Sequence, residues 1–179
     1  EVILARDYEI GLNIIHNANN YTLSNTYGMP GLNKKIVDSY LKSDGSRFTD
    51  VPGYSTMEFY QEMQGRDPRL TQTVRGPGYT RIGQTARLSP DFSCSTTGYQ
   101  LTKWVTDVSQ DGYNKSYNDI ILFRAAEVYL NFAEAKAERG TLTQDGINNS
   151  IKPIRDRRGR PNLDIKAANA NPDPYLGSH

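Results

Sequence analysis

The side chains in this sequence that are best suited to chemistry are aromatic rings and amides, which can recognise a ligand without transforming it. The chain has 12 Tyr and one Trp, and Asn residues flank several of them. Sugars present C–H faces that pack on such rings, and a Tyr hydroxyl can also reach a hydrogen-bond partner. The alternative stays open that the Asn residues serve turns and the Tyr residues serve packing. We predict four ligand-binding residues: Tyr21, Tyr27, Tyr54 and Trp104.

Pairs of carboxylates offer a second kind of chemistry, the acid–base hydrolysis of a glycosidic bond. The available pairs are Glu127 with Glu134 and Asp91 with Asp107. On a helix, however, the two glutamates fall on one polar stripe with Arg124, which is typical of an ion-paired or solvated face. We therefore predict no catalytic residue and expect a binding protein rather than an enzyme.

Metal, cofactor and nucleic-acid sites are not indicated by the sequence. His16 and His179 are far apart and Cys94 stands alone, so no transition-metal cluster is visible. The basic run at residues 152–160 is expected at a helix C-terminus, where the helix dipole favours cations. The formal net charge is +1. We therefore expect no metal, no cofactor and no nucleic-acid partner.

Two arginines, Arg66 and Arg69, flank the pair Asp67-Pro68. Guanidinium groups in this position can grip an acidic ligand. They can equally pair with carboxylates or loop carbonyls and hold a junction between two elements, and we favour this structural role.

The longest regular element expected is a helix at residues 118–139. At 100° per residue its polar side chains form one narrow stripe, and apolar side chains cover most of the remaining surface. Such a helix needs neighbours on several sides, so we place it in a helical array. Asn118 or Asp119 is the expected N-cap, and Gly140 the residue that ends the helix.

A second helix at residues 143–152 is expected to pair with the first. Thr143 is a suitable N-cap, and Pro153 should kink or end the helix because it cannot donate to the carbonyl four residues earlier. A long helix, a short glycine turn and an antiparallel partner form a tetratricopeptide-like hairpin. Such a unit cannot bury its faces alone, and the sequence contains one copy.

The rest of the chain is expected to be long loops with a few short elements. Apolar periodicity indicates helices at residues 31–42 and 55–63. Alternating or β-branched runs indicate strands at residues 2–5, 70–75 and 99–106. Polar and Gly-rich stretches indicate loops at residues 11–30 and 76–98.

Five segments carry a family resemblance in the same order along the chain. They lie at residues 1–5, 31–45, 65–70, 98–104 and 123–159. The third reads Gly65-Arg-Asp-Pro-Arg-Leu70, and the last combines Phe123-Arg-Ala-Ala-Glu-Val-Tyr-Leu-Asn-Phe-Ala-Glu-Ala135 with Ile154-Arg-Asp-Arg-Arg-Gly159. Together they resemble the SusD/RagB family, outer-membrane nutrient-binding lipoproteins of Bacteroidetes-type bacteria.

The resemblance implies a mainly α, SusD-like fold. The chain is then expected to be a single partial domain, the C-terminal part of such a protein. Residues 1–117 would form the loop-rich ligand side and residues 118–160 the helical hairpin. Both ends of the chain read as truncations, so the lipid anchor and the remainder of the protein are expected outside this sequence, and that remainder is an expected partner.

The resemblance also implies a function. Such a protein binds an oligosaccharide at the surface of the bacterial outer membrane, to which it is lipid-anchored, and delivers it to a TonB-dependent outer-membrane transporter. Two alternatives stay open: a peptide-binding member of the same family, and a helical-repeat scaffold for protein partners.

Overall fold

The computed structural model describes residues 2–177, which divide into two compact units. One unit contains the chain start up to Asp7 together with the chain from Asp119 onward, and the other is Tyr8–Asn118. Residues 2–7 therefore belong to the same unit as the helical hairpin, whereas the sequence analysis placed them in the loop-rich part. None of the helices in the described part has the length and apolar character needed to cross a membrane.

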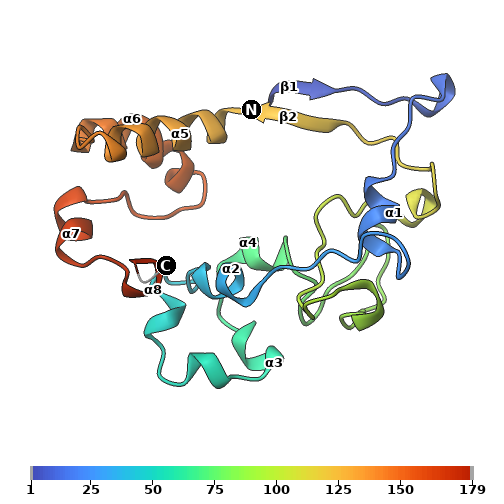
Figure 1. Ribbon diagram of the computed structural model, residues 1–179, viewed down its shortest axis with the longest axis horizontal. Helices are drawn as coiled ribbons and strands as arrows, with labels where there is room; N and C mark the ends of the chain where they lie inside the picture. The colour runs from blue at the N-terminus through green and yellow to red at the C-terminus, as the bar shows by residue number, and fades with distance from the viewer. Residues whose placement is uncertain (1, 178–179) are drawn as a thin grey trace. The chain divides into compact units, whose positions relative to one another are not determined.

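The first unit begins with a two-stranded antiparallel sheet (Figure 1), in which β1 (Val2–Arg6) pairs with β2 (Ile120–Arg124). The expected strand at residues 2–5 is thus confirmed. The prediction that the main helix begins at 118 is wrong, because the run from Ile120 to Phe123 is rich in β-branched and aromatic side chains and pairs with β1. The backbone of Arg124 is still extended and serves as the N-cap residue of the helix that follows.

The helical hairpin of this unit is formed by α5 (Ala125–Glu138) and α6 (Gln144–Asp156). Gly140 ends α5 with φ +65°, and the Thr141 N–H donates to the Lys136 carbonyl at 2.9 Å, which closes a Schellman turn. The Thr143 hydroxyl accepts from the Gly146 N–H at 3.1 Å and caps α6. The capping roles predicted for Gly140 and Thr143 are confirmed, whereas the predicted N-cap at Asn118 or Asp119 is wrong, because Arg124 takes that position.

Of the two effects expected of Pro153, a kink or the end of the second helix, the helix end does not occur there. Proline has no N–H donor of its own, yet α6 continues to Asp156, and the Arg157 N–H donates to the Pro153 carbonyl at 3.3 Å. Two short helices follow in the same unit, α7 (Ile165–Ala170) and α8 (Pro174–Gly177). The Asp164 carboxylate caps α7 by accepting from the Ala167 N–H at 2.9 Å.

The apolar surface of α5 is only partly covered within residues 2–177. Ala133 is buried, and α5 packs against α6. The larger side chains Val128, Leu130 and Phe132 remain exposed, as do most apolar residues of β1 and β2. The sequence predicts neighbours on several sides of α5. Residues 2–177 cover the helix on one side, through α6.

The second unit is built from short helices joined by long connections. They are α1 (Ala18–Leu23), α2 (Lys34–Ser39), α3 (Phe59–Glu62) and α4 (Pro68–Thr71), with 3₁₀ turns at Ile10–Leu12, Phe48–Asp50, Tyr54–Thr56, Phe92–Cys94 and Val108–Gln110. The helix α1 lies in the stretch predicted as loop. The helix predicted at residues 31–42 forms over six residues, capped by the Asn33 side chain.

Three further predictions for this unit are wrong or only partly confirmed. The helix expected from 55 is broken, because Glu58 and Gln61 form a capping box that starts α3 later. The strand expected at 70–75 is wrong: Asp67 and Pro68 start α4, with the Asp67 carboxylate accepting from the Arg69 N–H at 2.9 Å. The strand expected at 99–106 is reduced to isolated bridges at residues 100 and 101.

The core of the second unit is a small apolar cluster beside a buried group of charges. Val37, Met63, Leu70 and Val74 form the apolar cluster. Next to it, the Lys34 ammonium lies 3.2 Å from the Asp38 carboxylate and 3.0 Å from that of Glu62, and both carboxylates are buried.

The charges of this group shift the pKa values of their neighbours. Burial lowers the pKa of Lys34, but its hydrogen bonds to Glu62 and Asp38 outweigh burial and raise it above the usual range. Burial, and after it the Glu62 carboxylate, raises the pKa of Tyr99 to about 12.

Arg66 and Arg69 have the structural role favoured from the sequence. The Arg66 guanidinium is buried and donates to the carbonyls of Glu62, Val37 and Tyr40 at 2.7, 2.6 and 2.9 Å. Arg69 pairs with the Asp67 carboxylate at 2.9 Å. These bonds hold α2, α3 and the start of α4 together.

Candidate functional site

Two of the predicted ligand-binding rings meet at the end of α1. The rings of Tyr21 and Tyr27 have centroids 5.5 Å apart and are almost perpendicular, at 82°. The two residues are 47% and 46% exposed, so their contact leaves ring surface open to a ligand. An edge-to-face pair of this kind also limits the freedom of both rings.

Gly28 is what allows the two rings to meet. Its φ is +81°, and a Cβ at this position would lie 2.5 Å from the Tyr21 carbonyl oxygen and 2.8 Å from carbons of the Tyr21 ring. A side chain there would displace the backbone or the ring. Gly28 therefore leaves room for the backbone and ring of Tyr21, and it adopts a positive φ that other residues rarely adopt.

Trp104, the third predicted ring, lies in a segment that runs beside α1. The Thr106 N–H donates to the Asn19 side-chain oxygen at 3.0 Å, and the Thr22 hydroxyl lies 3.5 Å from the Lys103 carbonyl. Trp104 has φ +67° and is 43% exposed. A bulky residue with positive φ is a backbone outlier, and such strain concentrates at functional positions.

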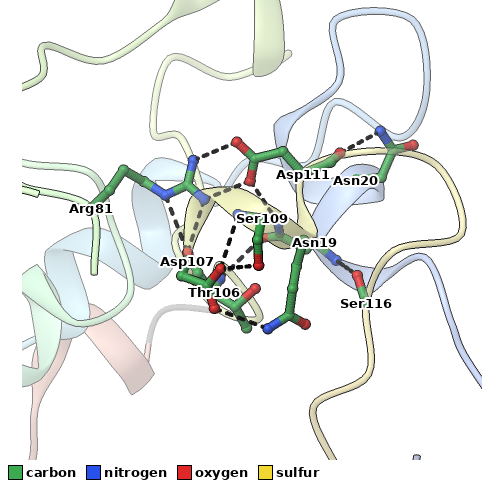
Figure 2. Close-up of polar contacts among 9 residues, drawn as sticks. Asn19, Asn20, Arg81, Thr106, Asp107, Ser109, Asp111 and Ser116 are labelled. Carbon is green, nitrogen blue, oxygen red and sulfur yellow. Dashed lines mark hydrogen bonds and ion pairs between the residues drawn. The ribbon is translucent and has the colours of Figure 1, made fainter. Parts of the chain in front are cut away.

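A buried polar network ties α1 to residues 106–116 (Figure 2). Asn19 is fully buried; its amide nitrogen donates to the Asp111 carboxylate at 2.8 Å and its backbone N–H to the Ser116 hydroxyl at 3.3 Å. The Asn20 amide donates to the Asp111 carbonyl at 3.0 Å. Satisfied networks of this kind rigidify their surroundings, so α1, which carries Tyr21, is held firmly against residues 106–116.

Arg81 completes the network from a third segment. Its guanidinium is buried and donates to both carboxylate oxygens of Asp111, at 3.1 and 2.6 Å, and to the Thr106 carbonyl at 2.8 Å. The hydrogen bonds to Asp111 raise the pKa of Arg81, although burial opposes them. The pair holds the turn that carries Arg81 against the segment of residues 106–111.

Tyr54 lies in a different cluster of the same unit. Its ring is half-buried and meets the Phe48 ring edge to face, with centroids 5.8 Å apart. The Arg66 guanidinium lies 3.6 Å from the centre of the Phe48 ring. This cluster sits near α3, apart from α1 (Figure 1). The structure thus brings together the segments of Tyr21, Tyr27 and Trp104, and places Tyr54 elsewhere.

The carboxylates considered for acid–base chemistry have other roles here. Asp91 caps the turn at Phe92–Cys94 and Asp107 caps the turn at Val108–Gln110, each accepting from a backbone N–H at 2.9 Å. Hydrogen bonds from Ser93 and Ser109 lower the pKa of Asp91 and Asp107. A general acid needs the opposite shift. Glu127 and Glu134 are exposed on α5 in the other unit.

The residues considered as metal ligands are engaged as well. The His16 ring donates from Nε2 to the Asn118 carbonyl at 2.9 Å and accepts at Nδ1 from the Ala18 N–H at 3.1 Å. Cys94 is buried, and burial raises the pKa of its thiol. From residue 2 to 177, no group of three or more His, Cys, Asp or Glu side chains is placed to hold a metal ion. His179 lies outside the described residues.

The helical hairpin, the two-stranded sheet and the loop-rich unit define a mainly helical protein of the SusD-like fold class. Residues 5–176 match the sequence model of the SusD family, and the chain belongs to that family. Both the fold class and the family expected from the sequence are confirmed. Proteins of this family bind nutrients such as glycans at the cell surface and are binding proteins, not enzymes. No curated protein and no solved structure matches the chain.

Proposed function

We propose that this protein captures an oligosaccharide on the surface formed by Tyr21, Tyr27 and Trp104 and delivers it to a TonB-dependent outer-membrane transporter. In this proposal the protein is lipid-anchored at the outer face of the bacterial outer membrane. The observation that carries the binding step is that three half-exposed rings, one of them on a strained backbone, belong to segments that hydrogen bonds of α1 and a buried polar network join.

The chemistry of the surface suits a saccharide. Flat rings cover the C–H faces of sugars, while phenol and indole groups reach the hydroxyls. Because α1 is already ordered by Asn19, Arg81 and Asp111, little further ordering is needed when the ligand binds. The pKa values of Asp91 and Asp107 are lowered, the opposite of what a general acid needs, and we propose binding and transfer of the ligand without hydrolysis.

Calorimetric titration against a panel of oligosaccharides tests the binding step. Tyr21→Ala and Tyr27→Ala should each weaken binding of the preferred glycan about 5- to 150-fold, since losing one stacked ring costs roughly 1–3 kcal/mol. The matched control is Phe123→Ala, an exposed ring of the other unit. Tyr54→Ala shows whether the ligand also reaches the cluster near α3.

Three results would contradict the proposal. If neither Tyr21→Ala nor Tyr27→Ala weakens binding by fivefold while the fold is intact, the surface lies elsewhere. Saturable binding of peptides and of no glycan would favour the peptide-binding alternative. Release of reducing ends by the pure protein would show an enzyme. Co-purification with a TonB-dependent transporter from solubilised outer membranes tests the delivery step, and its absence would contradict that step.

A further inference from the structure

A second concave site lies in the loop-rich unit, and it shares no residue with the surface around α1. It has a volume of about 250 Å³ and is lined by Phe59 and Tyr60 of α3, by the turn at residues 76–78 and by residues 87–90. Small-molecule pockets usually measure ~300–1,000 Å³. A site of this size suits one sugar unit of a longer chain.

The walls of this cleft are held in place before any ligand arrives. A Cβ at Gly76 would lie 2.7 Å from the terminal methyl of the buried Met63, so the turn packs directly on the core. The opposite wall belongs to a hairpin in which the Leu88 N–H donates to the Tyr79 carbonyl at 2.9 Å. Arg81 anchors the same hairpin through Asp111. A preformed cleft loses little entropy on binding.

The lining combines one open ring with one cation. Tyr60 is 64% exposed, which leaves its ring free to stack. Arg87 is the one ionisable group of the lining besides the Tyr60 phenol. The Arg87 guanidinium makes no ion pair or hydrogen bond to any residue that the structure describes between 2 and 177. A guanidinium matches the two oxygens of a carboxylate with parallel hydrogen bonds.

A neighbouring hollow on the other side of the turn lacks this chemistry. It is lined by Thr71 and residues 76–79 and measures about 300 Å³. The Arg75 guanidinium lies 5.6 Å from the centre of the Tyr79 ring and donates to the Gln100 side chain at 3.2 Å, so this cation is already engaged. The cleft between Tyr60 and Arg87 is therefore the better binding site.

We propose that the cleft between Tyr60 and Arg87 binds a uronic acid unit of the captured glycan. The sugar ring packs on Tyr60, its carboxylate pairs with Arg87, and its hydroxyls meet the Ser89 side chain and the backbone of residues 76–78. This assignment rests on the proposed glycan-binding function. It adds that the preferred ligand is an acidic polysaccharide fragment.

Titration with a trigalacturonate and with its methyl ester tests this assignment, because the two probes share a shape and differ in charge. We expect the acid to bind about tenfold to a hundredfold more tightly than the ester. Arg87→Gln should abolish that preference, and Arg87→Lys should restore part of it, since lysine keeps the charge but loses the paired geometry. Tyr60→Ala should weaken binding of both probes. Lys115→Gln, an exposed cation of the same unit, is the matched control.

Equal binding of acid and ester, or a preference that persists in Arg87→Gln, would overturn the assignment. A short peptide whose terminal carboxylate binds as well as the trigalacturonate, with the same loss in Arg87→Gln, would overturn it in favour of peptide ends. If other glycans bind through Tyr21 and Tyr27 but neither probe binds, the assignment fails and the proposed function stands. If no glycan binds at all, both fail.

Discussion

Replacing Gly28 by alanine adds one carbon atom, the Cβ, to the proposed binding surface. The added Cβ would stand 2.5 Å from the Tyr21 carbonyl oxygen and 2.8 Å from two carbons of the Tyr21 ring. These atoms are backbone and aromatic, so neither can swing aside as the end of a flexible side chain can. We expect Tyr21 to be displaced and its contact with Tyr27 to be lost.

The effect of Gly28→Ala on stability and on binding can be estimated separately. Holding an alanine at φ +81° costs roughly 1–2 kcal/mol of folding free energy, and the lost ring contact about 0.5–1.5 kcal/mol more. Glycan affinity should fall about 5- to 150-fold if the contribution of one ring is lost. Urea denaturation measures the stability, and calorimetric titration measures the affinity.

Gly83→Ala is the matched control, because it introduces the same strain without the clash. Gly83 has φ +73°, and a Cβ there meets nothing within 4 Å. It should lose roughly 1–2 kcal/mol of stability and keep its affinity for glycan. Equal losses of stability in the two variants, with unchanged binding in both, would refute the role given to Gly28.

Three further predictions concern the supporting structure. Asp111→Ala should cost about 2–3 kcal/mol of stability in urea denaturation, because it leaves the buried Arg81 guanidinium without its carboxylate; a loss below about 0.5 kcal/mol would contradict the network. Ala133→Leu should lower the free energy of unfolding by about 1–3 kcal/mol, because it crowds the contact between α5 and α6. Glu134→Gln, at an exposed position, should change it by no more than about 0.5 kcal/mol. Equal effects of the two substitutions would show that the buried face of α5 is misassigned. The pKa values of Lys34 and Tyr99 are raised above their ordinary values of 10.5 and 10.0 in the folded chain, so the folded chain keeps protons that the unfolded chain releases. Thermal stability should therefore fall as pH rises above 10. Tyr99→Phe should make that fall shallower, and an unchanged slope would argue against the raised Tyr99 pKa.

Local signals in the sequence are sufficient to predict the turn of the helical hairpin. Gly140 and Thr143 act on backbone groups within a few residues, so the turn between α5 and α6 could be placed without knowing the rest of the fold. The start of α5 could not be placed in this way. Residues 120–123 suit either a helix or a strand, and their pairing with β1 near the other end of the chain decides between the two.

The same distinction applies to the candidate site. The exposed rings could be named from the sequence because Tyr and Trp lie beside Asn-rich loop segments. The polar network beside α1 could not be named: Asn19 lies 92 residues from Asp111, Arg81 lies 30 residues from it, and no periodic pattern connects the three. Asp111-Gly112 reads only as a turn in the sequence. Its role depends on two segments that folding brings to it.

The single tryptophan gives the most direct test of the account. Because the chain has one Trp, its indole fluorescence reports on Trp104 alone. We predict that titrating the protein with its preferred glycan changes this emission saturably, with the same midpoint as the calorimetric titration, and that Tyr21→Ala shifts both midpoints equally to weaker binding. Calorimetric binding of a glycan with no change in Trp104 emission would contradict the central claim that the ligand lies on this surface.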